Sequence, residues 1–190
     1  MNPIYLLASY FMLVAAYPLD SEDCELYAPS TMHEFCCDIH DESSEFMDCQ
    51  IEWSDKIHYT NDEQEMNYNF CVSECVYNAT HYLGADRKSL KMGLIKHHLS
   101  ELHGDEASEA LMLKTYEMCG KHAKDMLEHK HVKELAERLK KYNCHVYPGL
   151  VFECVSNELI LNCPPKQYHS NAPCDHAKDY LKSCLKHKKN

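Results

Sequence analysis

The amino-acid sequence predicts an all-α domain held together by disulfides. Apolar residues recur three and four positions apart from about residue 61 to residue 187, and no stretch alternates polar and apolar residues over the length of a strand. The 190-residue chain carries twelve cysteines, an even number that allows every thiol to be paired. We therefore expect six or more helices, joined by short loops, in one compact domain.

The first residues have the features of a signal peptide. The run 4–16 is apolar except for one serine, and no charge precedes Asp20. It is shorter than the about 20 residues that span a membrane. Val14-Ala15-Ala16 provides the small residues that a signal peptidase prefers, so we predict removal of residues 1–16 and a single domain over 17–190. Export to an oxidising compartment favours disulfides over thiolate zinc sites.

Helical periodicity places the expected helices in order along the chain. A serine or threonine opens each of the first two and can cap it. Asn61 or Asp62 caps the third, whose first turn carries Glu63 and Glu65, where the helix dipole favours acids. The expected helices cover residues 31–37, 43–50, 61–82, 89–101, 106–127, 130–142, 150–161 and 174–187.

Glycine and proline mark where these helices begin and end. Gly84 is expected to end the third helix. Pro148-Gly149 opens the apolar helix 150–161, and Pro164-Pro165 ends it. Cys71 and Cys75 lie four residues apart on one face of the third helix, so each should pair with a different partner.

The charge of the chain argues against nucleic acid as a partner. The formal net charge is −11, whereas phosphate binding needs basic patches. Residues 20–65 hold fifteen acids against one base, Lys56, and the last nine residues hold four lysines and no acid. The two ends can attract one another within one molecule or in a homodimer. The simpler interpretation is that both are solvated surfaces.

The sequence contains no convincing enzyme motif. Cys36-Cys37-Asp38-Ile39-His40-Asp41 resembles the C-C-x-x-H-D segment of secreted calcium-dependent phospholipases. That family requires a cysteine where Ser43 stands, and a glycine-rich calcium loop upstream, but no glycine precedes Gly84. No zinc-binding H-E-x-x-H, nucleophile elbow or phosphate loop occurs. We predict neither catalysis nor a metal or cofactor.

Two further features bear on regulation and modification. Protonation of all fourteen histidines would change the formal charge from −11 to +3. Mild acid is therefore expected to loosen the fold or its pocket, unless the histidines are exposed and titrate without consequence. Asn78-Ala79-Thr80 is a glycosylation sequon late in the 61–82 helix, and its use depends on the face that Asn78 takes.

The cysteine spacing carries a family resemblance. From Cys49 onward it is Cys49-x21-Cys71-x3-Cys75-x43-Cys119-x24-Cys144-x9-Cys154-x8-Cys163-Pro164-x9-Cys174. The x3 and x8 gaps resemble the core framework of insect odorant-binding proteins. Cys144, Pro164 and Cys174 resemble the additions of the Plus-C subclass. The resemblance spans residues 49–174, most of the chain.

This resemblance implies a helical domain around an apolar cavity. It implies a secreted carrier of odorants or pheromones, in the sensillum lymph and acting with olfactory receptors, without a cofactor. The family's bridges join the first and third, second and fifth, and fourth and sixth core cysteines. Carried over, the pairs are Cys49–Cys75, Cys71–Cys154 and Cys119–Cys163, with Cys144–Cys174 added and two more among Cys24, Cys36, Cys37 and Cys184. Cys36 or Cys37 is an alternative to Cys49 as the first core cysteine.

The expected ligand-binding residues come from three of the helices. The alternative interpretation is that each of these residues is an ordinary part of the hydrophobic core. The alternative function is a secreted interaction or inhibitor module that has the same disulfides and a filled core. The residues expected to line a cavity are Met92, Ile95, Leu99, Met112, Tyr116, Met118, Phe152, Val155 and Leu159.

Overall fold

The computed structural model describes residues 36–39, 44–102 and 106–187. Within them the only β-structure is two isolated bridges, so the predicted all-α class is confirmed. The signal peptide and nearly all of the predicted helix at 31–37 lie outside the described residues. The helices are α2 (Ser44–Ser54), α3 (Asp62–Ala79), α4 (Met92–Leu102), α5 (Glu106–Met126), α6 (Lys130–Leu139), the 3-10 turn η3 (Lys140–Tyr142), α7 (Val146–Asn162) and α8 (Ala172–His187).

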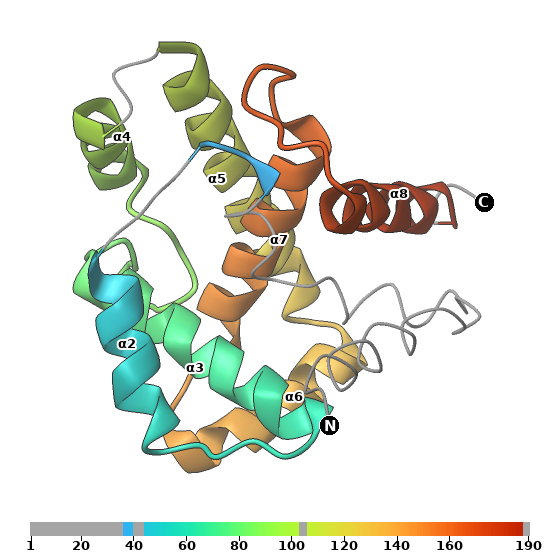
Figure 1. Ribbon diagram of the computed structural model, residues 1–190. Coiled ribbons are helices and arrows are strands. Elements are labelled where there is room, and N and C mark those ends of the chain that lie inside the picture. The colour runs from blue at the N-terminus through green and yellow to red at the C-terminus, as the bar shows by residue number, and fades with distance from the viewer. Residues whose placement is uncertain (1–35, 40–43, 103–105, 188–190) are drawn as a thin grey trace, which may run out of the picture.

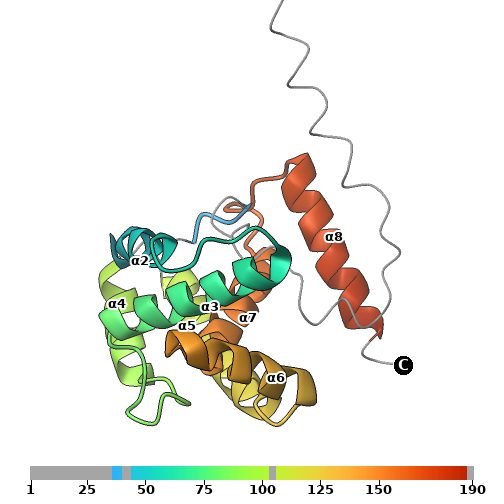
Figure 2. The same cartoon turned by 90° about the horizontal axis from the view of Figure 1, so that it is seen from below.

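Helix α7 lies in the middle of the molecule, with α3, α5, α6 and α8 packed against it (Figure 1). Helix α2 covers α3, and α4 covers α5. Helix α8 stands to one side of the other helices and reaches them through α7 (Figure 2). One apolar cluster fills the space between α4, α5 and α7, and a second fills the space between α2, α3, α6 and the start of α7. The central position of α7 explains why it is apolar on all sides.

Helix α3 is capped at both ends by local hydrogen bonds. Asn61 Oδ1 accepts from Gln64 N at 2.9 Å, and the Gln64 side chain accepts from Thr60 N at 2.8 Å. At the other end Tyr82 N donates to Tyr77 O, and His81 N donates to Asn78 O, with His81 at φ 60°. These bonds form a Schellman motif. The helix therefore ends at Ala79, before the predicted Gly84, because a histidine takes the left-handed position that usually favours glycine.

The segment between α3 and α4 is a loop tied across its own base. Leu83 pairs with Leu90 in an isolated bridge, and Lys91 N donates to Tyr82 O at 2.8 Å. Because residues 89–91 take part in this pairing, α4 begins at Met92 rather than at Ser89 as predicted. Helix α7 begins at Val146, earlier than predicted, so that Pro148 lies in its first turn, where a missing N–H costs nothing.

Five disulfides join described residues, and three of them hold α7 in place. The bridges flank α7 at Cys144 and Cys163 and attach to its middle at Cys154. Cys184 is disulfide-bonded as well, in a bridge whose other half lies outside the described residues. The five pairs are Cys36–Cys174, Cys37–Cys163, Cys49–Cys75, Cys71–Cys144 and Cys119–Cys154.

The structure corrects most of the pairing that the resemblance implied. Cys49 pairs with Cys75 as implied, but Cys71–Cys154, Cys119–Cys163 and Cys144–Cys174 are wrong. The interlocking order of the family is nevertheless kept when Cys144 is the fifth core cysteine and Cys154 the sixth. The gaps before and after Cys154, x9 and x8, are nearly equal. The fifth and sixth core cysteines could therefore be either Cys144 and Cys154 or Cys154 and Cys163.

The expectation of two more bridges among Cys24, Cys36, Cys37 and Cys184 is also wrong, because Cys36 pairs with Cys174 and Cys37 with Cys163. Cys37 also forms an isolated antiparallel β-bridge with Tyr168, and Asp38 N donates a hydrogen bond to Gln167 O at 2.9 Å. Cys36 is helical, and Cys37 is the residue that takes part in this bridge. The two adjacent thiols reach different partners, Cys174 and Cys163.

Gly149 sets how closely α7 approaches α3. A methyl group built on Gly149 would overlap the Phe70 ring, with Cγ at 2.6 Å and Cε1 at 2.7 Å. Phe70 is buried on α3 and has no space to retreat. We expect Gly149→Ala to lower the free energy of unfolding by about 1–3 kcal/mol, measured by guanidinium denaturation.

Gly93 provides the matched control, since a methyl group there would meet nothing within 4 Å. Gly93→Ala should leave stability unchanged or raise it by up to about 1 kcal/mol. Equal destabilisation by the two substitutions would contradict this account of the contact between α3 and α7.

The carboxyl of Glu153 on α7 gives stability a dependence on pH. Burial raises the pKa of this group to about 8 from a usual value of 4.5. Between those values the folded protein keeps a proton that the unfolded chain has lost, so this group's contribution to stability falls as pH rises. Because the side chain is only partly buried, we expect Glu153→Gln to stabilise the protein at pH 8 by an amount of the order of 1 kcal/mol. At pH 4 the variant and the original should have equal unfolding midpoints, and an equal difference at both pH values would refute this assignment.

A candidate ligand groove between α4 and α5

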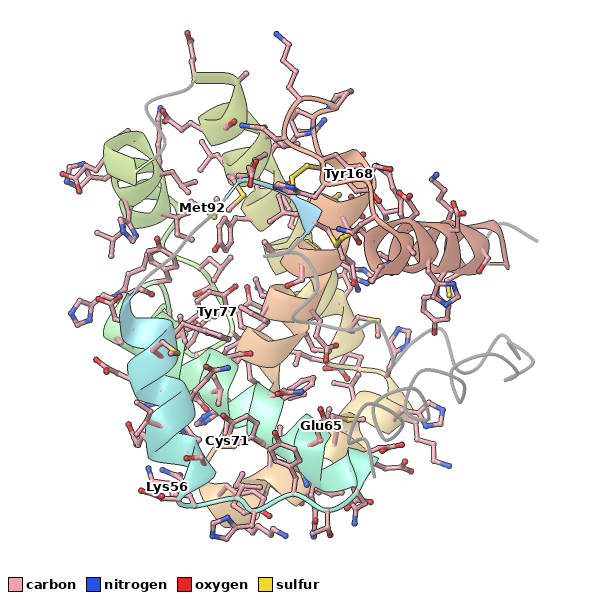
Figure 3. All side chains as sticks on the ribbon, viewed as in Figure 1. Lys56, Glu65, Cys71, Tyr77, Met92 and Tyr168 are labelled. Carbon is pink, nitrogen blue, oxygen red and sulfur yellow. A yellow bond between two sulfur atoms is a disulfide. The ribbon has the colours of Figure 1, made fainter. Side chains whose placement is uncertain are left out.

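A groove of about 550 Å³ lies between the 88–90 loop, α4 and α5, and it is open to solvent on one side. Its lining is mainly apolar, and lysines stand along its edges. Figure 3 labels Met92, which lies on the α4 side facing α5. The lining residues are Lys88, Ser89, Leu90, Met92, Gly93, Lys96, Leu113, Tyr116, Glu117, Gly120, Lys121, Lys124 and Tyr147.

Helical spacing explains how α5 builds one wall of the groove. Leu113, Tyr116, Gly120 and Lys124 follow one another at three or four residues and therefore share a face of the helix. Helix α4 contributes Met92 and, one turn later, Lys96 in the same way. The groove thus runs between this face of α5 and the first turns of α4.

The floor of the groove depends on Gly120. Because this residue has no side chain, the phenol of Tyr147 can reach the backbone of α5 and donate to Gly120 O at 3.2 Å. A methyl group on Gly120 would lie 3.1 Å from Leu90 Cδ1 and 3.3 Å from the Tyr147 oxygen. Burial, reinforced by the charge of Asp86, raises the pKa of Tyr147 to about 12. The phenol therefore stays neutral and remains a hydrogen-bond donor at physiological pH.

Tyr116 connects the groove to an aromatic cluster beneath it. Its ring meets Tyr82 edge-on at 6.0 Å and Tyr77 at 6.4 Å, distances at which such pairs are favourable. The Tyr82 phenol in turn shares a hydrogen bond with His98 Nδ1 on α4. These contacts hold the ring of Tyr116, a buried residue that also lines the groove.

A buried carboxylate holds the loop that forms the near end of the groove. The Glu74 side chain, on α3, is only 5% exposed. Its Oε1 accepts from Arg87 Nη1 at 2.5 Å, and its Oε2 accepts from His145 N at 2.5 Å. His145 Nδ1 lies 2.8 Å from Oε1. Glu74 thereby joins α3, the loop that carries Lys88 and Leu90, and the start of α7.

The structure brings only two of the predicted ligand residues, Met92 and Tyr116, to this groove. Phe152 is partly buried against the same cluster and stacks on Phe46 at 6.0 Å. Met118 is 42% exposed, so its predicted inward orientation is wrong. It stands two residues from Tyr116 and therefore points away from it around α5. The remaining predicted residues are buried in the apolar cluster behind the groove: Ile95, Leu99, Met112, Val155 and Leu159.

Sequence reasoning missed Tyr147, Gly120 and the lysines of the groove. A signal for the α5 wall was present in the spacing of Leu113, Gly120 and Lys124. A signal for Glu74 was also present, because it lies three residues after Cys71 and therefore on the same side of the helix. No local signal could show that Tyr147 and Gly120 meet, since they are 27 residues apart.

The enzyme and metal hypotheses gain no support from the described residues. No group of three or more histidines, cysteines or acids within them could hold a metal ion. His40, of the phospholipase-like segment, lies outside them, and both Cys36 and Cys37 are in disulfides. None of the described helices is long and apolar enough to cross a membrane.

The described residues form a helical domain whose six core cysteines are bridged first to third, second to fifth and fourth to sixth, which is the architecture of an insect odorant-binding protein. The chain belongs to the AgamOBP47-like family, whose family model matches residues 39–180. No curated protein and no solved structure gives a match. This is a family of binding proteins rather than enzymes, typically extracellular, which agrees with the disulfides. The Plus-C subclass stays a prediction.

We call the bonds from Glu74 to Arg87 and His145 the Glu74 clamp. Substitution of Glu74 should lower the stability of the protein measurably. Glu74→Gln keeps the size of the side chain but removes the charge that binds Arg87 and His145, two side chains that are each 45% exposed. Since water can replace part of the lost bonding, we expect the free energy of unfolding to fall by about 1–3 kcal/mol. The measurement is a denaturant-induced unfolding curve.

Glu137→Gln is the control, because Glu137 and its partner Lys140 are both 68% exposed. An exposed pair of this kind should cost about 0.5 kcal/mol or less. Similar small losses for both variants would show that Glu74 does not hold the loop.

Proposed function

We propose that the protein is a secreted carrier of small hydrophobic ligands, which it holds in the groove between α4 and α5. The observation that carries this proposal is an apolar-floored groove of about 550 Å³ in a chain of the odorant-binding type. Its volume falls within the about 300–1,000 Å³ typical of small-molecule sites. Odorants or pheromones are the ligand class that the family supports, and an extracellular fluid such as the sensillum lymph is the proposed location.

The covalent framework favours a groove that stays open. Cys119–Cys154 ties α5 to α7, so that the helix forming one wall cannot slide toward α4. The Glu74 clamp fixes the loop at the near end. Without such constraints the helices would tend to close over the apolar floor, because closure removes apolar surface from water. A ligand that covers the floor removes apolar surface from water and gains about 25 cal/mol for each Å² buried.

A second candidate function follows from an apolar ridge on α2. Met47 and Ile51, one turn apart, are 64% and 63% exposed. Such a pair favours a protein partner, as in the alternative interaction or inhibitor module. Under that function the groove would bind no hydrophobic probe, and the protein would not deliver ligands to olfactory receptors.

Blocking the groove tests the carrier function. Gly93 lines the groove and has open space around it, so Gly93→Phe should fill the groove without disturbing the core. We expect the affinity for the fluorescent hydrophobic probe N-phenyl-1-naphthylamine to fall about tenfold or more, measured by titration.

Two variants control for size and for the added ring. Gly93→Ala should retain the affinity, because a methyl group leaves most of the groove free. Ser100→Phe adds the same ring on an exposed position of α4 that does not line the groove, and should also retain it. Unchanged binding in Gly93→Phe would place the ligand elsewhere, and no probe binding by the original protein would refute the carrier function.

A further inference from the structure

We propose that the groove selects amphiphiles with an aliphatic tail and a carboxylate head. The tail would lie on the apolar floor and the carboxylate among the lysines at the edge. This inference rests on the proposed function and goes beyond it, because apolarity alone does not distinguish an acid from an alcohol or an ester.

The sign of the charge at the groove is opposite to that of the chain. Overall, thirty acids outnumber nineteen lysines and arginines. Along the groove the ratio is reversed, with four lysines and one acid, Glu117. The lysines come from three parts of the fold, the 88–90 loop, α4 and α5, so one basic helix face does not account for them.

Three of these lysines are left for a ligand. Lys121 is paired with Glu117 at 2.9 Å, and that pairing lowers the pKa of the Glu117 carboxyl. Lys88, Lys96 and Lys124 form no ion pair with any other residue that the structure describes.

Two acids whose charges act on Lys88 and Lys124 also bind other groups. Asp86, whose charge acts on Lys124, accepts from Ser89 Oγ at 2.7 Å and from Lys88 N at 3.0 Å. Glu128, whose charge acts on Lys88, is paired with Lys133 at 2.8 Å. Together with Glu117 they make three acids against the four lysines of the groove.

The start of α4 adds to this potential. Met92 and Gly93, its first two residues, line the groove, and the first turn contains no acid. A helix N-terminus carries a partial positive charge, which favours an anion nearby. Helix α3, by contrast, places three acids in its first turn. The missing acids at α4 leave its positive end to the groove.

The form of the site favours a carboxylate on an apolar tail over a small or highly charged anion. Its cations are flexible lysines, which act as point charges, and no arginine provides the planar fork that grips phosphate at two points. Leu90, Met92 and Leu113 offer surface that only an apolar tail can cover. Fatty-acid-like molecules combine both properties.

The test compares two ligands of the same length, dodecanoate and dodecan-1-ol, as competitors of N-phenyl-1-naphthylamine at neutral pH and low salt. The original protein should bind dodecanoate about five- to tenfold more tightly than the alcohol, and added salt should reduce this preference because exposed charges are screened. The triple variant Lys88→Gln, Lys96→Gln, Lys124→Gln should lower the preference to about one. The same charge is removed by the control Lys114→Gln, Lys166→Gln, Lys182→Gln, outside the groove, which should keep the full preference.

Each result distinguishes this inference from the carrier function. Loss of the preference in the groove variant alone supports the inference. Equal affinity of the original protein for the acid and the alcohol refutes it and leaves the carrier function standing, as does a preference that survives in the groove variant. Loss of preference in the control as well would assign the effect to net charge rather than to the groove. Absence of binding by both ligands and by the probe would overturn both proposals.

Discussion

The fixed position of α7 is the constraint on which the rest of the structure depends. Bridges tie the chain just before this helix to α3, its middle to α5 and the residue after its end to the 36–39 segment. Each such bridge typically contributes about 2–4 kcal/mol by restricting the unfolded chain. An apolar helix held at three points can serve as the centre of a small domain. Helices α3, α5, α6 and α8 pack against it, while α2 covers α3 and α4 covers α5.

The groove is a consequence of this arrangement. Tyr147, in the first turn of α7, reaches Gly120 on α5, and the bridge between Cys119 and Cys154 ties the same two helices together. The Glu74 clamp lies where α3 meets the start of α7, next to the bridge between Cys71 and Cys144. It positions the loop that carries Lys88 and Leu90 at one end of the groove. Helix α4 packs against α5 without a bridge of its own among the described residues, so the groove lies between a fixed wall and a less constrained one.

Charge gives the groove a chemical character that its shape alone does not. The protein as a whole is strongly acidic and repels anions at long range. The lysines beside the apolar floor reverse the sign of the charge locally. The groove is therefore the place where we propose that an anionic head group binds. A carrier of this kind would discriminate among ligands of similar length by the charge of the head group as well as by their fit to the floor.

The sequence by itself determined the elements and the class, because both depend on short-range patterns. Periodicity located the helices, and the cysteine spacing indicated the odorant-binding framework that the family match confirms. Only the tertiary structure decided which thiols pair, since similar gaps around Cys154 allow two registers and pairing depends on which helices meet. It also decided that α3 ends where His81 takes the left-handed conformation. It turned Met118 toward solvent and brought Lys96 and Tyr147 to the groove. Helices from distant parts of the chain create these environments, and no local pattern encodes the distance between them.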